Sequence, residues 1–520
     1  MKRIITTLLF VLTLSTLLAA EKPRLVVQIV VSSMRAGDLE RYAENYGEGG
    51  LKRLLAEGLH YTEAGYDFRQ TLTPTTLTTL STGAQPSMHG VVGDSWYDYT
   101  TKLPVQLTDG IHGEGGYNLL ASTLAETLIR QNPHSKAISL AMDAQSAITL
   151  GGRSGHIYWI DPQLAEWTTS YYYTREPLAW VAPLNREGHN IGYLLPSWKQ
   201  LLDPTAYRNT RYSDIRIVLD AKRGTFKTGE KRITPRSYIE RLRYTPGGNS
   251  AVLGFAKEAI TRLELGKDNE PDLLNICLDA SRYLHEIYGP ESVEVEDMYY
   301  RLDRDLSDLM TFLDTTVGKG KSIVVLTSDH GTSASYDLAK EAQERFRVMQ
   351  FRVIANGFLN ARYGTGSWIL GYRNGSLYLD HDLIYERNLD LATVQNELCI
   401  FAMQFSGVSH ALSGSALRST YFGDGYGRRM QNSYYPRRSG DVELNLLPGV
   451  IEEREGVRSL AGSMYGYDSR VPLIIHGTTE TPQRIDRTID LTALAPTLAR
   501  LMGIGDPEAA EGKPLTELID

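Results

Sequence analysis

The side chains of this chain that could do chemistry gather in a few short segments of its 520 residues. These segments are residues 29–35, 82–90, 326–331 and 467–473, with a related stretch at residues 490–498. The third segment places Asp329 and His330 directly after an apolar run. A carboxylate beside an imidazole can bind a metal ion or move a proton, but this pair alone is a weak indication of function. The order of the segments along the chain is more informative than any one of them.

The elements that must position these segments can be predicted from the apolar patterns. Residues 24–31, 273–278 and 322–327 are nearly continuous apolar runs, which is typical of strands buried on both faces. Between the last two lies a helical pattern, residues 293–317, with leucines on one face. This alternation predicts an α/β fold with a doubly wound, mostly parallel sheet flanked by helices. Ligands bind such sheets beyond the carboxyl ends of the strands.

Two stretches lose this rhythm and divide the chain. Residues 161–245 are rich in Tyr, Trp, Arg and Pro, and residues 346–460 hold short strand-like pieces and a segment rich in Gly, Arg and Tyr. We interpret both as cap insertions over the ligand-binding edge of the sheet. The core α/β domain is then built from residues 21–160, 246–345 and 461–520.

The first 20 residues are typical of a signal peptide. Lys2 and Arg3 precede an apolar stretch, and Ala19 and Ala20 offer small residues for cleavage. We therefore expect a periplasmic or secreted protein with no transmembrane span after cleavage. The net charge of −8 argues against general nucleic-acid binding. Cys277 and Cys399 each stand in an apolar run, which favours two buried thiols over a disulfide.

Taken together and in this order, the segments resemble the alkaline phosphatase superfamily, specifically its nucleotide pyrophosphatase/phosphodiesterase branch. They are most similar to bacterial alkaline phosphatases with a Thr nucleophile, and residues 288–297 and 318–321 share that similarity. The resemblance spans nearly the whole mature chain and implies an alkaline phosphatase-like fold. It also implies two zinc ions, held by three Asp and three His, and a Thr that attacks phosphorus.

Position by position, the resemblance places the nucleophile at Thr73, although Pro74 stands one position earlier than the family's usual Pro. For the metal that activates the nucleophile, Asp329 and His330 remain, while Ser32 replaces an Asp. The three ligand positions of the other metal are all replaced, by Arg282, Glu286 and Arg470. His285 lies one residue away from a ligand position.

The positions that contact phosphate in the family's monoesterases are replaced as well. Asp94 stands where an Asn is expected, and Asp143 and Gln145 fall where a Lys and an Arg form a clamp. A charge count of the metal pocket gives two arginines, Arg282 and Arg470, against Glu286 and Asp329. We therefore expect these four side chains to converge in ion pairs that make a metal superfluous. On this basis we expect no cofactor, or at most one metal ion.

The predicted function is that of a catalytically inactive pseudophosphatase with a binding or scaffold role, in which Thr73, Asp329 and His330 are remnants. Its partner would be an unknown protein of the cell envelope, and the arginines could also bind an anion such as phosphate. One alternative is a metal-dependent phosphoric ester hydrolase, acting on mono- or diesters, that uses Thr73. Another is a structural subunit of a cell-envelope assembly.

Overall fold

The computed structural model describes residues 22–193, 198–211, 219–220, 225–226, 239, 242–335 and 345–519. The predicted signal peptide, residues 1–20, lies outside this part of the chain. Within the described residues, the helices are all too short or too polar to cross a membrane. Cys277 and Cys399 are buried and free, as predicted.

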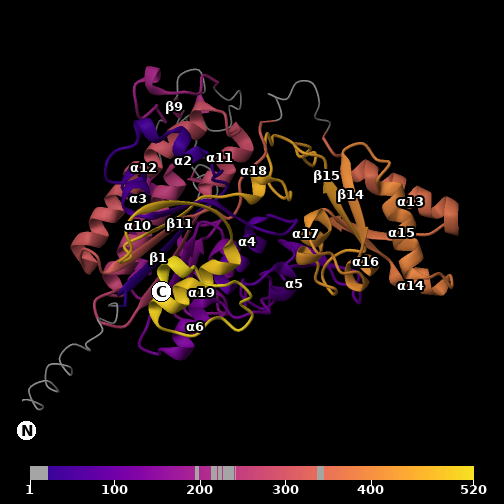
Figure 1. Cartoon of the computed structure of the whole chain (residues 1–520), viewed down its shortest axis with the longest axis horizontal. Coiled ribbons are helices and arrows are strands. Elements are labelled where there is room, and N and C mark those ends of the chain that lie inside the picture. The colour runs from indigo at the N-terminus through magenta and orange to yellow at the C-terminus, as the bar shows by residue number, and fades with distance from the viewer. Residues whose placement is uncertain are drawn as a thin grey trace, which may run out of the picture.

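A nine-stranded sheet forms the centre of the molecule (Figure 1). Its spatial order is β17 (Gln483–Asp490), β2 (Leu59–Gly65), β16 (Leu473–His476), β11 (Ser322–Thr327), β1 (Leu25–Val31), β10 (Asp272–Leu278), β5 (Ala137–Ala141), β6 (His156–Ile160) and β7 (Trp167–Thr168). The five strands from β11 to β6 are parallel, and β16 and β7 pair antiparallel at either side of them. The three strands predicted from apolar runs are confirmed as β1, β10 and β11.

Helices cover both faces of the sheet, as the apolar runs predicted. Alternate residues of β1 face opposite layers, so that Val27 and Ile29 belong to one apolar core and Val26 and Val30 to the other. The first core is covered by α3 (Leu51–Glu57), α10 (Gly247–Arg262), α11 (Ala280–Tyr288) and α12 (Val293–Leu313). The second is covered by α4 (Thr73–Thr82), α6 (Leu124–Gln131), α7 (Ala144–Gly151) and α19 (Leu494–Met502).

A second lobe stands beside the sheet, next to α4 and α5 (Pro86–His89) (Figure 1). It has its own four-stranded antiparallel sheet, in the order β12 (Ile369–Arg373), β13 (Ser376–Leu379), β15 (Val442–Leu446), β14 (Val408–Ser413). Its separate apolar core is closed by α13 (Val348–Tyr363), α14 (His381–Glu386) and α15 (Leu391–Ala402), and α16 (Gly414–Ser419) and α17 (Gly425–Ser433) extend it. The chain enters this lobe at Phe346, which pairs with Glu452 where the chain leaves. In contrast, the described part of residues 161–245 packs into the core of α10 and α12 through Trp167 and Trp198.

The segment just before α4 ties the two lobes together. The Arg69 guanidinium donates hydrogen bonds to the Glu443 carboxylate and to the carbonyl oxygen of Leu444, the latter over 2.7 Å. Both side chains of this ion pair are only 3% exposed. The backbone N–H of Arg69 also donates to Ser433 Oγ, over 2.7 Å. Thr73 therefore begins its helix from a segment that the second lobe holds in place.

We predict that Arg69→Met lowers the free energy of unfolding by about 3–5 kcal/mol, because it leaves the Glu443 carboxylate buried without its cation. Denaturant-induced unfolding would measure the loss. Arg362→Met is the matched control, since Arg362 is 59% exposed in its pair with Glu397 and should cost below about 1 kcal/mol. Equal losses in the two variants would contradict the account of the lobe junction.

Candidate active site at the carboxyl edge of the sheet

Four of the predicted site residues lie just beyond the carboxyl ends of adjacent parallel strands. Asp329 and His330 follow β11, and Ser32 follows β1. Asp279 follows β10, and Asp143 comes two residues after β5. Because these strands are neighbours in the order β11, β1, β10, β5, about 5 Å apart each, their side chains form one row. This is the edge at which doubly wound sheets bind ligands.

Thr73 is brought to this edge by α4. It is the first residue of the helix and is 4% exposed. Near the C-terminal ends of α4 and α7, Ser81 Oγ donates to the Thr149 carbonyl over 2.7 Å. Since the two helices end side by side and α7 starts just after β5, α4 also starts at the carboxyl edge of the sheet. Pro74 fits the first turn because its missing N–H has no helical partner there. The N-terminus of α4 favours an anion beside Thr73.

A hydrogen bond joins Thr73 to His330. Thr73 Oγ1 lies 3.1 Å from His330 Nε2, and the imidazole is 2% exposed. The other ring nitrogen, Nδ1, lies 2.6 Å from the carbonyl oxygen of Gly331. Because a carbonyl can only accept, Nδ1 carries a proton, and in the tautomer with this single ring proton Nε2 is an acceptor. The Thr73 hydroxyl therefore donates its proton toward His330.

Asp329 is fully buried next to this pair and accepts hydrogen bonds from uncharged donors. Ser32 Oγ donates over 2.5 Å, and the backbone N–H groups of Ser33 and His330 donate over 2.9 and 2.7 Å. Ser33 adopts a left-handed φ of 64°, an uncommon conformation for a residue other than glycine. Among the described residues, the only basic side chain within ion-pair distance of Asp329 is His330, with Nε2 3.3 Å from Oδ2. The site thus keeps a carboxylate that no guanidinium neutralises.

The predicted convergence of two arginines on Glu286 and Asp329 is wrong. Arg470 Nη1 lies 2.9 Å from Glu63 Oε2, and the Arg470 side chain is 60% exposed. The backbone explains this placement, because Arg470 forms a bridge with Gly65 at the end of β2, the strand that also carries Glu63. Arg282 pairs with Asp143 over 2.9 Å. Neither arginine is paired with Asp329, so the two arginines do not take the place of a metal ion there.

Arg282 instead belongs to a cluster around Asp143, the residue at one predicted phosphate-contact position. Arg243 donates to Asp143 Oδ1 over 3.0 Å, and Arg282 and the Tyr283 hydroxyl donate to Oδ2 over 2.9 and 2.6 Å. The guanidinium carbons of the two arginines lie 4.7 and 4.6 Å from the centre of the Tyr283 ring. Sequence reasoning missed Arg243 and Tyr283, and nothing in their spacing points to Asp143.

Asp279 was also missed, although its position directly after the apolar run 273–278 was a signal. Its buried carboxylate accepts from the N–H groups of Met142 and Asp143 and from Ser146 Oγ, over 2.9, 3.1 and 2.6 Å. Burial, with the nearby charge of Asp143, raises the pKa of Asp279 to about 7. Asp279 therefore stabilises the N-terminus of α7, beside the Asp143 cluster.

Gln145 and Asp94 make none of the described hydrogen bonds or ion pairs with Thr73 or His330. Gln145 is the second residue of α7, and Asp94 precedes β3 (Ser95–Tyr97) and accepts from Ser95 Oγ over 3.0 Å. His285 is fully buried, with Nδ1 2.7 Å from the carbonyl oxygen of Ser281 and Nε2 3.9 Å from Asp38. Its ring is thus directed toward Asp38 and the backbone of its own helix.

Comparison with known proteins agrees with this geometry. The family model described as type I phosphodiesterase / nucleotide pyrophosphatase matches residues 26–380. The chain belongs to this family. It is 31% identical to the alkaline phosphatase PafA of Elizabethkingia meningoseptica over 98% of both chains, and 28% identical to the alkaline phosphatase PhoV of Synechococcus elongatus over 96% of this chain and 93% of the other. The crystal structure of wild-type PafA superimposes with a TM-score of 0.88 at 29% identity, covering 96% of this chain and 100% of that one.

The two-zinc arrangement expected from the family resemblance can be tested against the donors that are present. Asp329 Oδ2 and Thr73 Oγ1 lie 3.3 and 3.1 Å from His330 Nε2. A tetrahedral zinc ion with bonds of about 2.0–2.1 Å spaces its donors about 3.3 Å apart. With Ser32 Oγ beside Asp329, these residues fit one metal of the phosphodiesterase family, with hydroxyls as two of the donors.

The second metal does not fit. Arg282 cannot coordinate a cation because a guanidinium has no acceptor, and Arg470 points away toward Glu63. In the described part of the chain, three or more His, Cys, Asp or Glu side chains do not gather in any one place as a metal-binding group. The site therefore offers donors for one ion, and those donors are incomplete without the two hydroxyls.

The raised pKa of Asp279 predicts a pH dependence of stability. The folded state holds this proton up to about pH 7 and the unfolded state only to about pH 4, so stability is lost as the pH rises between these values. Asp279→Asn cannot ionise, so relative to wild type its free energy of unfolding should rise by about 2–3 kcal/mol from about pH 5 to pH 7. Glu508→Gln, at a side chain that is 67% exposed, is the control and should follow wild type. Parallel pH profiles for Asp279→Asn and wild type would show that the buried carboxyl does not titrate in this range.

Proposed function

We propose that the protein is an exported phosphoric ester hydrolase that uses Thr73 as its nucleophile and one metal ion. The observation that carries the proposal is the 3.1 Å hydrogen bond from the Thr73 hydroxyl to the acceptor nitrogen of His330, at the start of α4. The family membership supports it, as do relatives named alkaline phosphatases that match over nearly the whole chain. The failed charge compensation removes the main argument for an inactive site.

In this proposal the phosphoryl group lies at the N-terminus of α4, where unpaired backbone N–H groups and the helix dipole attract its oxygens. Thr73 Oγ1 forms a bond to phosphorus, the ester P–O bond breaks, and the alcohol leaves with a proton. Water then cleaves the Thr73 phosphoester and releases phosphate. A metal held by Asp329, His330, Thr73 and Ser32 would lower the pKa of the Thr73 hydroxyl. In the absence of a metal, the Thr73 hydroxyl donates its hydrogen bond to His330 Nε2.

Positive charge at the other end of the row comes from arginines in place of the second metal. Arg243 and Arg282 bring two cations to the single carboxylate of Asp143, and the Nε–H of each is buried without an acceptor among the described residues. These donors could reach phosphoryl or leaving oxygens, although they supply less than a divalent ion. We therefore expect turnover slower than that of an enzyme with both metals.

The replaced second metal site favours one other candidate, the pseudophosphatase with a binding or scaffold role in the cell envelope. In that case Arg243, Arg282 and Asp143 would be a structural cluster, and a protein partner or an anion would be bound without turnover. The same assay decides between the two candidates.

The test compares wild type with Thr73→Ala and Thr73→Ser on aryl phosphate mono- and diesters, with zinc, manganese or magnesium added. We expect wild-type turnover above background, a loss of at least about a hundredfold in Thr73→Ala, and partial activity in Thr73→Ser, which keeps a hydroxyl. Arg282→Gln should lower kcat/KM, whereas Arg470→Gln, at the exposed arginine, should not. Wild-type rates at background with every metal would favour the pseudophosphatase.

A further inference from the structure

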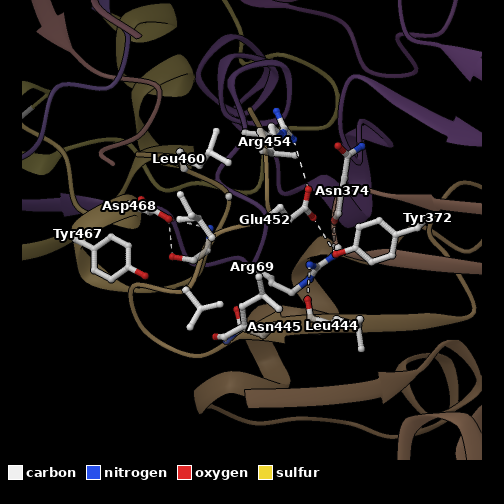
Figure 2. Close-up of a pocket in the computed structure, with 18 residues that line it drawn as sticks. Arg69, Tyr372, Asn374, Leu444, Asn445, Glu452, Arg454, Leu460, Tyr467 and Asp468 are labelled. Atoms are coloured by element: carbon white, nitrogen blue, oxygen red, sulfur yellow. Dashed lines mark hydrogen bonds and ion pairs between the residues drawn. The ribbon is translucent and has the colours of Figure 1, made fainter. Parts of the chain in front are cut away.

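A small cavity with both polar and apolar lining lies between the sheet and the second lobe, beside the residue that precedes Thr73 (Figure 2). On one side it is lined by Leu72, the residue before Thr73, and by Asp468. The carbonyl oxygen of Asp468 accepts from the N–H of Gly331, over 2.7 Å, one residue from His330. On the other side it is lined by the second lobe, through Tyr372 of β12 and Leu444 of β15. Its volume is about 70 Å³.

The Asp468 carboxylate has one oxygen without a donor. Asp468 is 1% exposed, and its Oδ2 accepts from the N–H and the hydroxyl of Ser463, over 2.9 and 2.5 Å. Its Oδ1 is buried and has no hydrogen-bond donor among the described residues. A buried carboxylate oxygen left unpaired is unfavourable, and such atoms often await a ligand or water.

Arg69 supplies the complementary group. It lines the same cavity, and its guanidinium donates to the Leu444 carbonyl (Figure 2). Its other Nη atom is bound to Glu443. Its Nε–H is buried without an acceptor in the described part of the chain. The walls of one cavity therefore hold one unused acceptor, Asp468 Oδ1, and one unused donor, Arg69 Nε.

One unused acceptor and one unused donor together favour a ligand group that can both donate and accept a hydrogen bond. A hydroxyl can donate to Asp468 and accept from Arg69, whereas an ammonium cannot accept and a hydrocarbon does neither. Arg69 is paired with Glu443, and Arg454 with Glu452. Burial raises the pKa of Asp468 to about 7. The lining therefore carries little net charge, which suits a neutral group. Since a water molecule takes about 30 Å³, the cavity of about 70 Å³ holds only a small group.

We propose that this cavity binds the hydroxyl-bearing end of the substrate's alcohol, so that the preferred substrates are phosphate esters of small polyols. The proposal rests on the proposed function, because it places the phosphoryl group at Thr73 and the alcohol beside Leu72. Esters of plain alkyl or aryl alcohols would leave Asp468 Oδ1 and Arg69 Nε unpaired.

The test is calorimetric binding of glycerol phosphate and propyl phosphate, which share a three-carbon chain and differ in hydroxyls, to the full-length Thr73→Ala protein. We expect glycerol phosphate to bind at least about fivefold more tightly. Adding Asp468→Asn, which turns an amide donor toward the cavity, should remove most of this preference. The control is Asp303→Asn on α12, where a buried carboxyl accepts from the backbone N–H groups of Gly47 and Leu51. This variant should keep the preference for glycerol phosphate.

The outcomes separate the two proposals. Equal binding of the two phosphates would mean that the cavity holds water only, which overturns the inference but leaves the phosphoryl site intact. Binding of neither phosphate would count against the proposed function and the inference together. The comparison of the two ligands needs no change at Asp468, so it remains decisive if Asp468→Asn does not fold.

Discussion

The hydrogen bond between Thr73 and His330 is the interaction on which the site depends. It joins the N-terminus of α4 to the carboxyl end of β11, two elements separated by 257 residues in sequence. Its direction is set by the Gly331 carbonyl, which holds the proton on Nδ1 and leaves Nε2 as an acceptor. The second lobe contributes through Arg69 and Glu443, which fix the segment leading into Thr73. The nucleophile is thus placed by both lobes at once.

The charges around this bond differ from those of the two-zinc site that the family resemblance implies. Asp329 stays buried and is surrounded by neutral donors, with Ser32 in place of a carboxylate. Two guanidiniums stand farther along the row, around Asp143, rather than against Asp329. The described residues offer donors for one cation beside Thr73, whereas Arg282 has no acceptor with which to bind a second. A carboxylate buried without a cation is costly, and a metal ion would relieve that cost.

The fold and half of the site could be predicted from the sequence, because they follow from strand order. Continuous apolar runs marked β1, β10 and β11, and the residues directly after parallel strands had to meet at one edge. Ser32, Asp329 and His330 lie at that edge, at the positions that the family resemblance implied. The rule does not apply to Arg470, which lies after a short helix instead of a parallel strand. Its backbone pairs with Gly65 at the end of β2, away from Asp329. Arg243 could not be anticipated, since it lies in a stretch without apolar periodicity and meets Asp143 across 100 residues.

The central claim is that the residues around Thr73 hold one metal ion and not two or none. Elemental analysis of the full-length protein, after loading with zinc and removal of free metal, tests it most directly. The account predicts one equivalent per chain, which is lost in Asp329→Ala and retained in Arg282→Gln. Two equivalents in wild type, or one that survives Asp329→Ala, would contradict it, as would a chain that retains no metal at all.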